Sequence, residues 1–111
     1  MMAKTYTAWL DKRRRLRLTR YAMNRLKSVY GGDTYEDAIE NLKAMGSLDR
    51  MSGYYWLLAV TDDPDLTPAL MKDVLIEIYR LPIVGRWRFR QLMNKTQFLN
   101  RVMNTIREEE A

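Results

Sequence analysis

Residues 11–27 read DKRRRLRLTRYAMNRLK, and this basic stretch sets the fold expected for the first part of the chain. Counted around a helix at about 100° per residue, residues 8–30 separate into an apolar half and a polar half. The polar half holds Arg13, Arg14, Arg17, Arg20, Asn24, Arg25 and Lys27, with Tyr21 among them. The apolar half holds Trp9, Leu16, Leu18, Ala22, Met23, Leu26, Val29 and Tyr30. The pattern predicts a long basic amphipathic helix from Ala8 to Tyr30.

Two cations do not fit this helix. Lys12 and Arg15 fall on its apolar half, near its start. Either the first two turns project beyond the core, or acidic residues from elsewhere in the chain neutralise these cations. Gly31 and Gly32 then end the helix, because glycine readily adopts the left-handed conformation that closes a helix C-terminus.

Charge is segregated along the sequence. Residues 1–31 carry a net charge of +8, residues 32–79 carry −7 and residues 80–111 carry +4, which gives the total of +5. Basic ends therefore flank an acidic middle. Such asymmetry bears on partners and not on fold. The basic ends can meet an external polyanion or the acidic middle of the same chain.

Helical spacing and capping residues continue beyond Gly32. Asp33 or Thr34 opens a helix that ends at Gly46, and the next helix runs from about Leu48 to Val60. A further helix runs from Pro68 to about Arg80, with Thr67 as its N-cap, because proline suits the first helical position.

The C-terminal third is expected to be helical as well. Residues 86–93 alternate like a strand, but no second strand is available for pairing, so a short helix is predicted there. Asn94 or Thr96 opens a last helix. The expected architecture is all-α, with five or six helices in a single domain over residues 1–111. Residues 1–7 and 108–111 are expected to fray.

The helix expected at residues 48–60 is apolar on most sides, which is typical of a central or interfacial helix. Gly53 within it is expected to allow close helix packing. Three adjacent aromatic residues, Tyr54, Tyr55 and Trp56, cannot easily all face inward in so small a chain. We therefore expect one of them to reach the surface, where it would form a homodimer contact. The alternative is a core that uses aromatic rings to fill volume.

The composition argues against catalysis. The chain contains neither cysteine nor histidine, so the thiol nucleophile, the commonest general base and the commonest metal ligand are missing. No phosphate-binding loop or metal-ligand spacing is present. Asp62, Asp63 and Asp65 do not match a calcium-binding loop and are expected to form a solvated turn. We expect a non-enzymatic protein without catalytic residues, metal or cofactor.

Two basic segments are the candidate binding residues. The polar half of the first helix, from Arg13 to Lys27, suits a nucleic-acid groove, because arginine pairs with phosphate or guanine and asparagine with adenine. Arg86, Arg88 and Arg90 alternate with Trp87 and Phe89, an arrangement that can clamp phosphates and stack on bases. If both segments lie side by side, they form one continuous basic surface. Alternatively, both are solvated faces of surface helices.

The leading hypothesis is a non-enzymatic nucleic-acid-binding or regulatory protein that contacts a polyanion through its arginine-rich helix. The alternative is a small protein-binding inhibitor or adaptor, of the phage or mobile-element type, that recognises an acidic protein surface. A basic helix lying on a membrane is a weaker third option, because the core needs the apolar residues of that helix. No apolar run approaches the roughly 18 residues of a membrane span. We expect a cytoplasmic protein.

Overall fold

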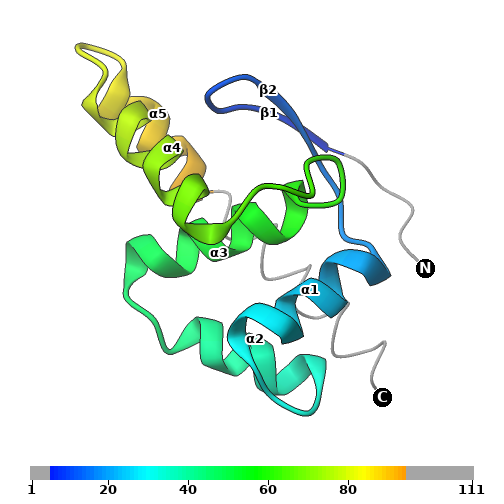
Figure 1. The fold of residues 1–111 in the computed structure, drawn as a ribbon. Coiled ribbons are helices and arrows are strands. Elements are labelled where there is room, and N and C mark those ends of the chain that lie inside the picture. The colour runs from blue at the N-terminus through cyan, green and yellow to red at the C-terminus, as the bar shows by residue number, and fades with distance from the viewer. Residues whose placement is uncertain (1–5, 95–111) are drawn as a thin grey trace.

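A computed structural model describes residues 6–94 of the chain (Figure 1). This part is mostly helical, as predicted. In chain order, the elements are β1 (Tyr6–Trp9), β2 (Arg13–Leu16), α1 (Arg20–Tyr30), α2 (Tyr35–Lys43), α3 (Ser47–Ala59), α4 (Pro68–Arg80) and α5 (Gly85–Asn94). The helix α3 lies between the α1–α2 pair and the α4–α5 pair, and β2 also contacts it. Within residues 6–94, no helix has the length and apolarity needed to cross a membrane.

The long helix predicted from Ala8 to Tyr30 is wrong over its first half. Residues 6–16 form an antiparallel hairpin in which Tyr6 pairs with Leu16 and Trp9 with Arg13. Helix α1 begins only at Arg20, because Thr19 is extended and its hydroxyl accepts a hydrogen bond from the amide of Ala22 at 3.1 Å. Within the predicted range, the prediction of a helix is correct only for residues 20–30.

The hairpin explains the two cations that did not fit a helix. Along β2 the side chains alternate between exposed and buried, so Arg13 and Arg15 face outward while Arg14 and Leu16 face inward. This is the period of two expected of a strand with one buried face. Lys12 lies in the turn and is exposed.

Backbone and side-chain bonds fix the end of the hairpin against α3 and the loop that follows it. The amide of Arg17 donates to the carbonyl of Leu58 at 2.8 Å. The hydroxyls of Thr19 and Thr61 lie 2.7 Å apart within hydrogen-bonding distance. These contacts join segments about 40 positions apart in the chain, so the strand-to-helix transition at Thr19 depends on tertiary structure.

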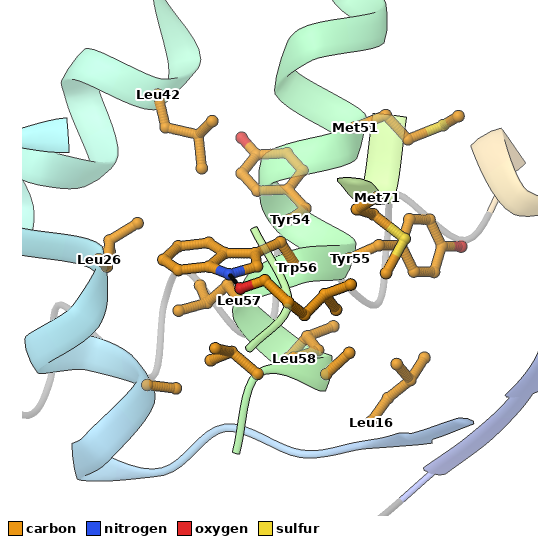
Figure 2. Packing of buried hydrophobic residues seen from close by; sticks show 14 of the residues in the cluster. Leu16, Leu26, Leu42, Met51, Tyr54, Tyr55, Trp56, Leu57, Leu58 and Met71 are labelled. Atoms are coloured by element: carbon orange, nitrogen blue, oxygen red, sulfur yellow. Dashed lines mark hydrogen bonds between the residues drawn. The ribbon is translucent and has the colours of Figure 1, made fainter. Parts of the chain in front are cut away.

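Helix α3 is buried along most of its length, as predicted for a central helix. Tyr54, Tyr55 and Trp56 all lie in the core, with 8%, 1% and 0% of their surface exposed, and Figure 2 shows them among leucine and methionine side chains. The expectation that one of them reaches the surface is therefore wrong. The physical reason is that polar atoms of these rings find hydrogen-bond partners inside the protein. The indole Nε1 of Trp56 donates to the carbonyl of Leu66 at 2.9 Å, and the hydroxyl of Tyr55 donates to the carbonyl of Leu92 at 2.9 Å.

Gly53 brings α1 and α2 close to α3, as predicted. A Cβ atom at this position would meet the side chain of Leu42 and would lie 2.6 Å from the hydroxyl oxygen of Tyr30. Only glycine leaves room for both neighbours in this arrangement.

The starts of α2 and α4 agree with the capping signals, whereas α2 ends at Lys43 and not at Gly46, which instead caps the start of α3. Thr34 and Thr67 each accept a hydrogen bond from an amide in the first turn of α2 and α4, and Pro68 opens α4. Gly31 and Gly32 have positive φ angles of 79° and 109° in the turn before α2. The segment around residues 86–93 is helical, as predicted. Tyr6 and Thr7 belong to β1, so the expectation that they fray is wrong. Asn94, expected to open a last helix, is the final residue of α5. The rest of that helix, and of the two ends expected to fray, lies outside the described residues.

Candidate polyanion-binding surface

The outer face of the hairpin presents an aromatic ring beside cations. Trp9 is 69% exposed, and its cross-strand neighbour is Arg13. Thr7 pairs with Arg15 on the same face, and all four of these residues are exposed. Directly opposed side chains on an antiparallel pair lie roughly 5 Å apart at Cβ, so the Arg13 guanidinium is within reach of the Trp9 ring. Lys12 adds a cation at the turn.

A hydrogen bond joins this face to the second basic segment. The Nη2 atom of Arg88, in α5, donates to the carbonyl oxygen of Trp9 at 2.5 Å. This bond brings α5 against the hairpin across 79 positions of the chain, whereas the basic residues of α1 take no part in it. We call this region the hairpin–α5 surface, defined by Trp9, Lys12, Arg13, Arg15 and Arg88. Arg86 and Arg90 are exposed on the same helix, with Arg86 lying 5.9 Å from the ring centroid of Tyr79.

Arg14 faces the interior and not a partner. Its guanidinium contacts both carboxylate oxygens of Asp11, at 2.8 and 2.9 Å, and one oxygen of Asp63, at 3.1 Å. Only 8% of the residue is exposed. The hydrogen bond from Arg14 lowers the pKa of Asp11, and the same bond raises the pKa of Arg14. The arginine is thus neutralised within the chain and does not belong to a free cationic face.

Arg17 is also paired internally. Its Nη2 and Nε atoms lie 3.1 and 3.3 Å from the carboxylate of Asp62. The turn at residues 62–65, expected to be merely solvated, therefore supplies the two carboxylates that hold the hairpin. The sequence carried a signal for this in its segregated charge, because the −7 segment lies between basic ends.

The predicted residues on α1 are partly used by the fold. Asn24 accepts a hydrogen bond from the hydroxyl of Tyr35 at 2.8 Å, and the ammonium of Lys27 lies 5.2 Å from the centroid of the same ring. Arg25 is half-buried, whereas Arg20 is exposed at the start of the helix. Asn24 and Lys27 thus connect α1 to α2.

The hairpin–α5 surface can bind an anion. Its charged groups are arginine and lysine, which donate hydrogen bonds and carry positive charge. Burial raises the pKa of both Tyr30 and Tyr55 to about 12, so these phenols stay protonated at neutral pH. In the part of the chain that the structure describes, no three acidic side chains gather closely enough to hold a metal ion.

No protein-family model, curated protein or solved structure matches this chain.

Proposed function

We propose that this chain is a non-enzymatic nucleic-acid-binding or regulatory protein that contacts a polyanion through the hairpin–α5 surface. The observation that carries the proposal is the environment of Trp9. Its side chain is 69% exposed, Arg13 lies opposite it on β2, and Arg88 binds its carbonyl oxygen. An indole that is 69% exposed is costly for a surface without a ligand, because large apolar rings favour burial.

The arrangement fits an unpaired strand of nucleic acid. A base stacks on an exposed aromatic ring, and arginines beside that ring bind the flanking phosphates. Arg13 and Arg15 follow one edge of the hairpin face, at alternate positions of β2, and are both exposed. We therefore propose single-stranded nucleic acid, in place of the groove-bound helix expected from the sequence, as the preferred polyanion.

The test is a fluorescence anisotropy titration with a labelled single-stranded oligonucleotide and its duplex. Wild-type protein is expected to bind the single strand more tightly, and affinity should fall steeply with added salt, because the bound cations displace counterions. Trp9→Ala should weaken binding by roughly fivefold to a hundredfold, since one base stack contributes about 1–3 kcal/mol. Arg13→Ala should weaken binding and reduce the salt dependence.

Two matched controls keep the test specific. Tyr21→Ala removes another exposed aromatic ring, on α1, and should leave affinity unchanged. Arg17→Ala removes an arginine that is paired with Asp62 and should change affinity much less than Arg13→Ala. A chain that binds no nucleic acid at low salt contradicts the proposal and favours the alternative, an acidic protein surface.

A further inference from the structure

The loop between α4 and α5 projects apolar side chains into water. Ile83 is 100% exposed, Leu81 is 42% exposed and Val84 is 46% exposed, and Tyr79 at the end of α4 is 47% exposed. Figure 1 shows this loop at the free end of the α4–α5 pair, the end farther from α3. We call Tyr79, Leu81, Ile83 and Val84 the apolar tip. Apolar residues that gather on a surface mark interaction sites.

Ile83 is also strained. Its φ angle is +70°, in the left-handed region that β-branched residues rarely enter. A small polar residue or glycine would suit both the conformation and the exposure. Ile83 therefore carries two independent free-energy costs, one from exposing an apolar side chain to water and one from its backbone conformation. Strain of this kind is characteristic of binding segments held in place by the surrounding structure.

The charges around the apolar tip define the partner that it fits. Arg80 and Arg86 flank it, and residues 78–94 contain no acidic residue. Arg80 pairs with Glu77 at 3.6 Å, and Arg86 lies over the ring of Tyr79. A complementary partner must therefore offer apolar contact together with negative charge.

The same chain presents such a surface along α4. A groove of about 400 Å³ lies between the hairpin turn with Arg14, the loop after α3 and the stretch of α4 from Leu70 to Glu77. Its apolar lining comes from Leu66, Leu70 and Val74, and Leu70 is 49% exposed. Acidic side chains surround this lining. We call it the acidic groove, and its lining includes Asp65, Asp73 and Glu77, together with Asp11 and Asp63, which bind Arg14.

We infer that the apolar tip of one copy of this chain docks into the acidic groove of a second copy. Leucine, isoleucine and valine side chains would meet the apolar lining, while Arg80 and Arg86 would face Asp65 and Asp73. The tip of a chain cannot reach the apolar lining of its own groove, because α4 separates Leu70 from Leu81 by 11 positions, which is roughly 16 Å along a rigid helix.

The contact is heterologous, since two different surfaces meet. Such contacts produce open chains of molecules or closed rings. The tip is small, so each contact should be weak and dependent on protein concentration. This inference concerns different residues from the hairpin–α5 surface and stands independently of nucleic-acid binding.

The test is analytical ultracentrifugation of the full chain and of two variants. Wild-type protein should form species larger than a monomer as its concentration rises. Ile83→Asp should remain monomeric because it lacks the tip, and Asp73→Lys should remain monomeric because its groove is altered. An equimolar mixture should form dimers and nothing larger, because the intact tip of Asp73→Lys still fits the intact groove of Ile83→Asp.

The mixing experiment also controls for folding, because both variants must be folded to bind each other. Met45→Asp and Asp33→Lys introduce the same charges at exposed positions outside both surfaces and should associate like wild type. Wild-type protein that sediments as a monomer at millimolar concentration overturns the inference. A mixture of the two variants that stays monomeric while wild type associates also overturns the inference. So does an Ile83→Asp variant that associates like wild type and loses only its affinity for an oligonucleotide.

Discussion

The guanidinium of Arg14 lies 3.1 Å from the carboxylate of Asp63, 49 positions further along the chain, and the two join the hairpin to the loop after α3. Asp11 completes the arrangement from within the hairpin turn. One buried arginine thus holds two carboxylates that would otherwise repel each other.

Arg14→Ala is expected to destabilise the protein by about 1–2 kcal/mol, because it removes three hydrogen bonds from a buried arginine to carboxylates that are 40% and 36% exposed. Urea unfolding measures the change. Arg15→Ala, at the neighbouring exposed position of β2, should stay within about 0.5 kcal/mol of wild type. Equal effects of the two substitutions would contradict the role given to Arg14.

The same pair predicts a pH dependence in acid. The bond from Arg14 lowers the pKa of Asp11 from its ordinary value of 3.8. The stability that it contributes is therefore present above pH 3.8 and is lost as the pH falls through the lowered pKa. The difference in unfolding free energy between wild type and Arg14→Ala should shrink over that range. Urea titrations at a series of pH values from neutral downward would show it, and a constant difference would contradict it.

Gly53→Ala should cost about 1–3 kcal/mol, because the added methyl group meets Leu42 and the hydroxyl of Tyr30 in a packed interior. Gly46→Ala is the matched control, since a Cβ atom there has no neighbour within 4 Å and the φ angle of −62° suits alanine. Chemical unfolding of both variants tests the close packing of α3. A Gly53→Ala protein as stable as wild type would show that the neighbours move aside freely.

Tyr55→Phe should destabilise the protein by about 1 kcal/mol at neutral pH, because the carbonyl of Leu92 loses its buried donor. This difference in stability depends on pH in alkali. Burial raises the pKa of Tyr55 from 10.0 to about 12, so its contribution is complete below pH 10 and falls as the pH rises toward 12. The stability gap between wild type and Tyr55→Phe should close over this interval. A gap that stays constant from pH 9 to about 12 would rule out a buried, protonated phenol.

Ile83→Gly is expected to stabilise the isolated chain by roughly 1 kcal/mol, because glycine tolerates the φ angle of +70°. Thermal unfolding at low protein concentration measures this without contributions from association. Ile83→Val keeps the branched side chain and the strain, so it should leave the melting temperature close to that of wild type. Loss of stability in Ile83→Gly would show that the side chain contributes to the folded monomer.

The helices that could be predicted from sequence are those whose ends are determined locally. Thr34, Thr67 and Pro68 act through hydrogen bonds and dihedral preferences within one turn. The helix starts that they predict therefore do not depend on the rest of the fold. The hairpin could not be predicted in the same way. Leu16 and Leu18 fit a strand as well as a helix. Which of the two forms depends on the ion pair of Arg14 with Asp63 and on the hydrogen bond from the amide of Arg17 to Leu58.

The candidate site was only partly predictable for the same reason. Arg13 and Arg88 belong to the surface that the structure assembles, whereas Arg14 and Arg17 are paired internally. Counted around a helix, Trp9 falls on the apolar half, so a helical pattern does not place it on a binding surface. Its alternation with Thr7, and the matching alternation of Arg13 and Arg15, were the signals of an exposed strand face.

The hydrogen bond between Thr19 and Thr61 has a consequence for the order of folding events. Residues 8–16 carry a helical pattern but lie in a hairpin, and two-stranded hairpins are marginal on their own. Their conformation is therefore decided only after the segment from Leu58 to Asp63 has taken shape. We expect α3 and α4 to form the folding nucleus, with the N-terminal segment switching from transient helix to paired strands late, at or after the rate-limiting step.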